Sequence, residues 1–363
     1  MKKLTKPISY FKEFKVIELA SVLAGPSVGM FFAELGAHVI KVENKQSGGD
    51  VTRSWKLAVE DQNHPFSAYY SSVNWGKESW MLDLKAAHDK ALLLEEIKTA
   101  DVVIANFKAG SAEKLGLDYE RLKSINAKLI YGEISGFGDS NRIAYDVVLQ
   151  AESGFLSMNG EPNRKPVKMP VALIDLLAAH QLKEGILIAL LAKEKNGKGA
   201  KVSVSLYDAA LAALANQATN YLMAGHIAQP LGTLHPNIAP YGECFSCQSD
   251  KLIVLAVGNN KQFTSLCQLL KLDQLSSDPR FEHNHLRVKN RKELSRYLEK
   301  AIKNWEREDL LSTMIAANVP AGAVRNIQEV LEMQTAQARI LNDQKEGHIL
   351  KTLSGNAFEI DWN

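Results

Sequence analysis

Two aspartates lie where the sequence pattern predicts that helices begin. Asp175 follows the small and apolar residues of VKMPVALID and opens a long apolar run, and Asp146 stands at the start of DVVLQA. The dipole and free N–H groups of a helix N-terminus hold a carboxylate in its ionised form, which suits a carboxylate nucleophile. The same position also suits a plain N-cap. Spacing alone favours this structural role for Asp175 and leaves Asp146 open.

Residues 21–43, SVLAGPSVGMFFAELGAHVIKVE, come close to a dinucleotide-binding fingerprint. That fingerprint is G-x-G-x-x-G with an acidic residue about 20 positions further on, and Glu43 is suitably placed. The glycines are Gly25, Gly29 and Gly36. Pro26 is compatible with the first turn of a helix but lacks the N–H that a pyrophosphate would need. A nicotinamide-dependent dehydrogenase is therefore disfavoured but stays an alternative.

The elements that would position these residues alternate between strands and helices. Short β-rich runs occupy residues 14–20, 38–43, 80–85, 101–107 and 128–138, and KVSVS adds another at 201–205. A long apolar helix is expected from Ile174 to a glycine stop at Gly197, and a further helix at 207–225. This alternation predicts an α/β fold in which helices cover both faces of a parallel, Rossmann-like sheet.

The pattern of predicted elements changes from about Gly232. A proline-containing loop is followed by a hairpin that turns at Gln248–Asp250 and by helical patterns up to Asn318. We therefore expect a smaller α+β domain. The predicted boundaries are 1–225 for the large domain, 226–325 for the small domain, and 326–363 for a C-terminal segment that returns to the large domain.

Composition and charge narrow the class of protein. The chain has 363 residues, is 46% hydrophobic and carries a net charge of +2 from 43 basic and 41 acidic residues, which is typical of a globular protein and gives no general field for nucleic acid or a membrane. No apolar segment reaches the ~18 residues needed to span a bilayer, so we expect a cytoplasmic protein. The cysteines Cys244, Cys247 and Cys267 are too few and too isolated to predict a disulfide framework or a metal site.

Many motifs occur in an order that resembles the type III CoA-transferase family, also called CaiB/BaiF. They include LAGPSVGMFFAELGAHVIKVE, GGDVTRSW, LDLK, DVVIANF, EISGFG, AYDVVLQAESG, NGKGAKVSVSLYDAAL, HPNIAPY, LAVGNNKQF, DPRFEHN and VPAGAVRNIQEVL. The resemblance implies an α/β large domain with a small domain, and an interlocked homodimer. It also implies that coenzyme A moves from an acyl thioester to a free carboxylic acid, without a metal or NAD.

The resemblance implies roles for the two aspartates and their neighbours. Asp175 matches the family nucleophile, which forms an acyl anhydride and then an aspartyl-CoA thioester. Asp146 is a second candidate carboxylate. Racemase members of the family carry histidine at the position of Tyr145, so that chemistry is disfavoured, and Tyr145 itself could contact substrate. His235, in the loop GTLHPN, could contact a carboxylate or order its own loop.

The same resemblance implies a set of residues along coenzyme A. They are Val22, Leu23, Ala24, Leu82, Lys85, Asn106, Phe107 and Lys114, with Lys45 in place of a frequent family arginine and Arg142 in a shortened loop. Lysine and arginine side chains pair with phosphates, and an aromatic ring can cover adenine. An acyl-CoA racemase or epimerase and a non-catalytic CoA-binding protein stay as alternatives. No sequence feature selects the acyl donor or acceptor.

Overall fold

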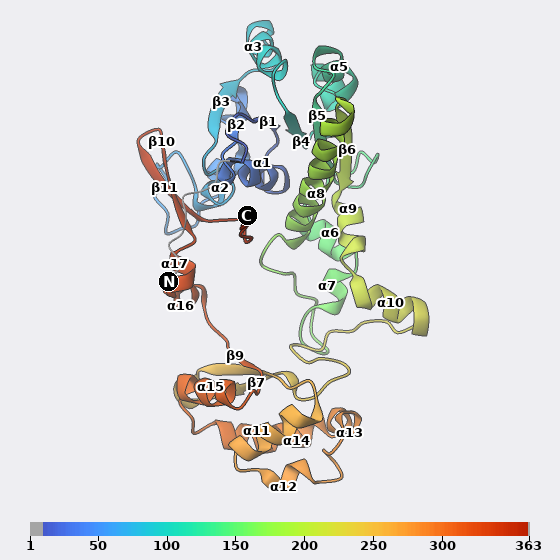
Figure 1. Ribbon diagram of the computed structural model, residues 1–363, viewed down its shortest axis with the longest axis vertical. Coiled ribbons are helices and arrows are strands. Elements are labelled where there is room, and N and C mark those ends of the chain that lie inside the picture. Colours follow the sequence, from blue (N-terminus) through green and yellow to red (C-terminus); the bar gives the residue numbers. More distant parts are fainter. Residues whose placement is uncertain (1–9, 362–363) are drawn as a thin grey trace. The chain divides into compact units, whose positions relative to one another are not determined.

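The computed structural model describes residues 10–361 of the chain, which form two compact units. The first unit contains the residues up to Leu156, residues 168–228 and the residues from Arg339 onward. The second contains Ser157–Val167 and Gln229–Ala338. Figure 1 shows the elements of both units in chain order from blue to red.

A six-stranded parallel sheet is the framework of the first unit. Its strands are β1 (Lys15–Leu19), β2 (His38–Asn44), β3 (Glu78–Leu82), β4 (Val102–Ala105), β5 (Ile130–Ser135) and β6 (Ala200–Ser205), in the spatial order β3-β2-β1-β4-β5-β6. This is the strand order of a doubly wound sheet, in which the chain reverses direction across the sheet between β1 and β4. The predicted α/β class and parallel sheet are confirmed.

Alternate side chains of the strands enter two separate cores, one on each face of the sheet. Val16 and Ile104 pack with residues of α1 (Ala24–Glu34), α8 (Leu173–Asn196) and α9 (Leu206–Ala212). Ile17 and Val103 pack with α3 (Ala87–Ile97) and α5 (Tyr119–Ile125) on the opposite face. Figure 1 shows α8 running along β5 and β6. Helices therefore cover both faces, as the buried β-rich runs predict.

The remaining elements of the first unit are short. They are η1 (Lys45–Ser47), η2 (Val51–Ser54), α2 (Ala68–Ser71), α4 (Ser111–Leu115), α6 (Asp146–Glu152), α10 (Ala215–Ala224) and the antiparallel hairpin of β10 (Ile340–Lys345) and β11 (His348–Leu353). The hairpin is tied to the sheet region by hydrogen bonds such as Lys345 Nζ to the Lys77 carbonyl oxygen at 3.1 Å. The short helix α7 (Phe155–Met158) lies at the boundary between the units.

Two helix boundaries test the sequence patterns. The long helix α8 ends at Gly197, whose φ of 69° is left-handed, so the expected glycine stop is confirmed. The single helix expected at 207–225 is instead two helices, α9 and α10. The break falls at Ala213–Leu214, next to Ala215, whose φ is 46°. That conformation cannot continue an α-helix of L-residues.

The second unit packs helices against a small antiparallel sheet. Its strands are β7 (Tyr241–Ser246), β8 (Leu252–Ala256) and β9 (Ala321–Ala323), and β7 and β8 are joined at η3 (Gln248–Asp250), where the hairpin turn is predicted. The helices are α11 (Asn260–Leu269), α12 (Asp273–Ser276), α13 (Asn284–Lys289), α14 (Arg291–Ile302), α15 (Arg307–Ala316), α16 (Ile327–Leu331) and α17 (Gln334–Gln337). Its core is built around Phe263, Leu298 and Met314. The predicted α+β character is confirmed.

The three cysteines are all free thiols, with Cys244 exposed and Cys247 and Cys267 buried. Within residues 10–361, no group of three or more His, Cys, Asp or Glu side chains is arranged to hold a metal ion. Among the described helices, none has the length and apolar character that crossing a membrane requires.

Candidate active site

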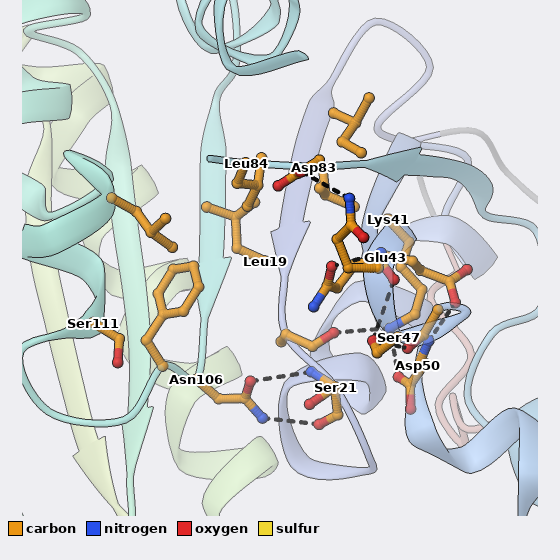
Figure 2. Close-up of a pocket in the computed structure, with 18 of the residues that line it drawn as sticks. Leu19, Ser21, Lys41, Glu43, Ser47, Asp50, Asp83, Leu84, Asn106 and Ser111 are labelled. Carbon is orange, nitrogen blue, oxygen red and sulfur yellow. Dashed lines mark hydrogen bonds and ion pairs between the residues drawn. The ribbon is translucent and has the colours of Figure 1, made fainter. Parts of the chain in front are cut away.

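A cavity of about 530 Å³ opens at the carboxyl ends of β1, β2, β3 and β4. Loops that leave the sheet on either side of the β1–β4 reversal diverge, and this is where doubly wound sheets bind ligands. Figure 2 shows Leu19 at the end of β1, Ser21 after β1, Asp83 and Leu84 after β3, and Asn106 after β4 around this space.

The structure brings four of the sequence-predicted coenzyme residues to the cavity wall. These are Leu82, Lys85, Asn106 and Phe107. Two lysines of the wall, Lys85 and Lys108, form no ion pair with a carboxylate of residues 10–361. Lys108 was not predicted, although its position directly after Asn106 and Phe107 at the end of β4 is a signal that sequence reading could use.

The other predicted coenzyme residues lie outside the cavity wall. Val22, Leu23 and Ala24 form the turn and helix start directly after Ser21, which does line the cavity. Lys45 begins η1, of which Gln46 and Ser47 line the cavity, and Lys114 lies on α4 between the lining residues Ser111 and Leu115. Arg142 is ion-paired with Glu152 and lies 4.2 Å from the centre of the Phe137 ring.

The turn that follows β1 is held by side chains from the segment after β4 and from the N-cap of η2. Asn106 accepts a hydrogen bond from the Ser21 N–H at 3.1 Å and donates one to the Ser21 carbonyl oxygen at 2.8 Å. Figure 2 shows both bonds. The next residue, Val22, has a φ of 73° and donates its N–H to Asp50 Oδ2 at 3.2 Å. Asn106 therefore shapes the cavity wall as well as lining it.

A buried cluster of four charged side chains supports this turn. Lys41 Nζ lies 2.9 Å from Glu18 Oε1 and 3.0 Å from Asp50 Oδ2, and Lys77 Nζ lies 2.6 Å from Glu18 Oε2. A buried charge is costly without a partner, and here each lysine has a carboxylate. We call Glu18, Lys41, Asp50 and Lys77 the charge cluster.

The spacing of the glycines in α1 follows from this packing. A Cβ on Gly29 would lie 1.9 Å from Glu18 Oε2, and a Cβ on Gly25 would lie 2.4 Å from the Cβ of Ala20. Both contacts are far closer than packed atoms allow. The glycines therefore let α1 approach β1 and the charge cluster. Pro26 lies in the first turn of α1, where the sequence pattern allows it.

Glu43, the acidic residue of the near-fingerprint, is committed to internal contacts. It accepts two hydrogen bonds from Arg53 at 2.7 Å, one from Tyr70 at 3.0 Å and one from the Asp50 N–H at 2.8 Å. Burial alone would raise the pKa of Glu43, but the hydrogen bonds and charge of Arg53 lower this pKa to about 2. Glu43 therefore acts as a structural anion in this unit rather than as a ligand for a ribose hydroxyl.

Asp146 and Asp175 lie together at the start of α8. Asp146 Oδ1 accepts the N–H of Ile174 at 2.7 Å and that of Asp175 at 3.4 Å, and Gln150 donates to the other oxygen of Asp146. Asp146 begins α6, but its side chain caps α8 from outside that helix. Asp175, in the first turn of α8, has 8% of its surface exposed.

The environment of Asp175 opposes its negative charge. Within residues 10–361, no Lys, Arg or His forms an ion pair with Asp175. Burial and then the charge of Asp146 raise the pKa of Asp175 from 3.8 to about 7. The environment therefore works against the expectation that the helix N-terminus keeps this carboxylate ionised, because burial and the charge of Asp146 disfavour the anion and Asp146 accepts the N–H groups of Ile174 and Asp175.

The charges of both aspartates act on Tyr69, which was not predicted from the sequence. Burial and then the charges of Asp175, Asp146 and Asp50 raise the pKa of Tyr69. Asp50 lines the cavity, and all four residues belong to the first unit. Tyr69 is on α2, far from either aspartate in sequence, so no spacing pattern could have identified it.

Tyr145 and His235 have local roles in the structure. Tyr145 is the exposed residue before α6. His235 lies in the second unit, where Nδ1 accepts the N–H of Asn237 at 3.1 Å and the ring lies 5.1 Å from that of Tyr241. Arg291 donates to the carbonyl oxygens of His235 and Ile238. His235 therefore orders its own loop.

The sequence model of the family described as CoA-transferase family III matches residues 11–360. The chain is 40% identical to a succinate–glutarate CoA-transferase of Agrobacterium fabrum, across 90% of this chain and 82% of that protein. It is 37% identical to an acetyl-CoA:oxalate CoA-transferase of Acetobacter aceti, across 92% and 85% of the two chains.

Similar proteins also include a human enzyme and a protein with a known crystal structure. Human succinyl-CoA:glutarate CoA-transferase is 35% identical, across 87% of this chain and 72% of that protein. A crystal structure of a CaiB/BaiF family protein from Brucella suis superposes with a TM-score of 0.85 and 38% identity, covering 96% of this chain and 93% of that chain. With the doubly wound unit and its cavity, these similarities show that the chain belongs to CoA-transferase family III and is a CoA-transferase.

Proposed function

We propose that this enzyme moves coenzyme A from an acyl-CoA to a free dicarboxylic acid, with Asp175 as the nucleophile. The observation that carries the proposal is a buried carboxylate without a cationic partner, in the same unit as the cavity at the switch point of the sheet. The acceptor class follows from the relatives, whose names include succinate, glutarate and oxalate, all dicarboxylic acids.

The proposed reaction begins when ionised Asp175 attacks the thioester carbonyl of the donor. The C–S bond breaks, coenzyme A leaves as a thiolate, and a mixed anhydride forms on Asp175. The thiolate attacks the aspartyl carbonyl of the anhydride, which releases the donor acid and leaves an aspartyl-CoA thioester. The acceptor carboxylate then attacks the aspartyl-CoA thioester, which forms a second anhydride and releases the coenzyme A thiolate. The thiolate attacks the acceptor carbonyl of this anhydride, so the acceptor leaves as the new thioester and Asp175 returns to its free form.

Burial gives Asp175 the properties that this role requires. A carboxylate that is stripped of water and has no salt-bridge partner is a stronger nucleophile than a solvated or ion-paired one. With a pKa of about 7, roughly half of the molecules carry the nucleophilic anion at neutral pH. Asp146 is a positioning residue, because it caps the first turn of α8 and so fixes where Asp175 lies.

Coenzyme A would lie in the cavity at the carboxyl ends of β1–β4. Lys85 and Lys108 supply unpaired positive charge for its phosphates, and Phe107 supplies an aromatic face for its adenine. The turn at Ser21 and Val22 would follow the pantetheine arm toward Asp175. The charges of Asp175, Asp146 and the cavity-lining Asp50 all act on the side chain of Tyr69, which supports this path.

We also propose that the enzyme works as an interlocked homodimer in the cytoplasm. Large apolar side chains are exposed on α10, where Leu222 is 79% and Met223 is 82% accessible. Apolar residues that gather on one surface commonly mark an interface between proteins. Sedimentation equilibrium should give twice the chain mass of 40.1 kDa, and a stable monomer would contradict this part of the proposal.

The experiment for the overall function is an acyl-transfer assay with succinyl-CoA as donor. We expect new thioesters with glutarate and other dicarboxylic acids, and at least about tenfold lower rates with monocarboxylic acids of the same length, since a carboxylate-binding site discriminates strongly against ligands that leave it unpaired. Exchange of the α-hydrogen of an acyl-CoA in deuterated water without any acceptor acid would instead indicate a racemase. Coenzyme binding without transfer to any acid would indicate a non-catalytic binder.

A further inference from the structure

We propose that Asp50 is a positioning residue for coenzyme A, because it holds Val22 in a left-handed conformation and so sets the shape of the turn that forms one wall of the cavity. The proposal rests on the coenzyme site proposed above. It extends that site to the charge cluster, whose members are buried beneath the turn.

The conformation of Val22 requires an external support. Its φ of 73° lies in the left-handed region, where a β-branched residue is a rare and strained exception. The structure supplies that support at the Val22 N–H, which lies 3.2 Å from Asp50 Oδ2 and 3.4 Å from Asp50 Oδ1. A turn that is strained in this way relaxes when its support is removed.

Asp50 is itself fixed by donors on both of its oxygens. Oδ1 accepts the Thr52 N–H at 3.0 Å and the Thr52 hydroxyl at 2.8 Å, and Oδ2 lies 3.0 Å from Lys41 Nζ. Only 1% of the Asp50 side chain is exposed. The position of the Asp50 carboxylate is therefore fixed, and the hydrogen bond from Val22 fixes the backbone of Val22 against it.

The charge cluster and Asn106 hold three consecutive residues of the chain. Lys41 Nζ donates to the Ala20 carbonyl oxygen at 2.8 Å, Asn106 pairs with both backbone groups of Ser21, and Asp50 accepts from Val22. Ala20 and Ser21 line the cavity. Figure 2 shows Lys41 and Asp50 on one side of the turn and Asn106 on the other.

This arrangement fixes the backbone conformation of the turn before a ligand binds. A site whose backbone is already fixed loses little conformational freedom on binding, and this raises the affinity for the ligand. The buried charges are shielded from solvent, so their hold on the turn does not weaken with salt as a surface pair would. We therefore expect the affinity for coenzyme A to depend on Asp50.

The test is calorimetric titration of coenzyme A into the full chain and into Asp50→Asn. Asparagine has one acceptor oxygen, so in either orientation its NH₂ group faces donors that Asp50 now satisfies. We expect affinity to fall about tenfold or more, as the loss of one strained conformation implies. The matched control is Asp101→Asn, because Asp101 also pairs with a lysine (Lys193) and accepts a backbone N–H (Lys15), but at the opposite end of the sheet. Its affinity should stay within about twofold of the unsubstituted chain.

A second substitution separates the positioning of Val22 from other causes of lost affinity. Glycine adopts the left-handed conformation without strain, so Val22→Gly added to Asp50→Asn should recover at least about threefold of the lost affinity. A loss of affinity that arises elsewhere in the site would not be reversed by this change. If Asp50→Asn does not fold, Thr52→Val carries the test, since it removes one donor to Asp50 and should weaken binding about threefold.

The outcomes are distinguishable. A loss of affinity in Asp50→Asn that Val22→Gly partly reverses supports the proposal, and so does the smaller loss in Thr52→Val. Unchanged affinity in these variants, or a loss that the glycine does not reverse, overturns it while leaving the coenzyme site intact. Failure of the unsubstituted chain to bind coenzyme A overturns both this proposal and the coenzyme site on which it rests.

Discussion

The first unit buries carboxylates in two regions whose electrostatic environments differ. In the charge cluster, Glu18 and Asp50 lie within 3.0 Å of lysine ammonium groups, and nearby Glu43 is held by Arg53. At the start of α8, the charge that acts on Asp175 is that of another carboxylate, Asp146. The same chemical group is stabilised as an anion in one region and destabilised as an anion in the other.

This difference separates the structural carboxylates from Asp175, the carboxylate that we propose to be the nucleophile. A cation lowers the pKa of Glu43 to about 2 against the effect of burial, whereas burial and Asp146 raise the pKa of Asp175 to about 7. A perturbed group beside a cavity is a candidate for catalysis, and an ion-paired one is a candidate for support. The predictions below test this distinction, beginning with the largest effect.

The largest effect is expected from Asp175→Asn, which keeps the shape of the side chain but removes the nucleophile. Transfer from succinyl-CoA should fall by about 10⁴-fold or more, as loss of a nucleophile does in other covalent enzymes. Affinity for coenzyme A should change little, because Asp175 does not line the cavity. Steady-state transfer rates and calorimetric titration measure the two quantities. Transfer within tenfold of the unsubstituted enzyme would place the reactive group elsewhere.

The next effect concerns the stability of the charge cluster. Lys41→Met leaves two buried carboxylates without a shared cation, which should lower the free energy of unfolding by about 3–5 kcal/mol. The matched control is Lys98→Met, because Lys98 forms an exposed pair with Glu95 and should cost less than about 1 kcal/mol. Urea denaturation followed by circular dichroism measures both. Equal losses in the two variants would mean that the cluster is not a structural support.

Asp175→Asn should have the opposite effect on stability, in a pH-dependent way. Folded Asp175 keeps its proton up to about pH 7, whereas the unfolded residue loses it near 3.8. Stability of the unsubstituted chain therefore falls as pH rises between these values. The advantage of Asp175→Asn should be below about 1 kcal/mol at pH 4 and about 4 kcal/mol at pH 8. Denaturation at both pH values measures it, and an advantage that shrinks as pH rises would contradict the raised pKa.

The smallest effect tests the influence of Asp146 on Asp175. Asp146→Asn keeps an oxygen to cap α8 but removes the second cause of the raised pKa. The pH at which transfer reaches half its maximum should move down by about one unit. Glu152→Gln, on the same helix but paired with Arg142, should leave the profile in place. A profile that shifts upward, or equally in both variants, would show that Asp146 does not set this pKa.

Sequence patterns predicted the features that depend on residues close to one another in the chain. The buried β-rich runs gave the parallel sheet, and the glycine after the apolar run gave the end of α8 at Gly197. Four of the residues implied by family resemblance line the cavity because they directly follow β3 and β4 or end them. Their positions depend on strand ends, which a sequence can indicate.

The remaining features depend on contacts between distant segments. Glu18 and Lys41 are brought side by side by the register of β1 against β2, and a shift of one residue would separate them. Asp146 caps α8 although 28 residues separate it from Ile174. No pattern within either segment identifies its partner, so the charge cluster and the raised pKa of Asp175 emerge only when the sheet and helices have assembled.

The most direct test of the account is mass spectrometry of peptides after the enzyme is mixed with succinyl-CoA and then with hydroxylamine. An anhydride or thioester on a carboxylate is converted by hydroxylamine to a hydroxamate, which stays on the residue that formed it. We expect this modification on Asp175 and none on Glu18, Asp50 or Asp146. A hydroxamate on one of those residues, or no modification with any acyl-CoA that supports transfer, would contradict the assignment of Asp175 as the nucleophile.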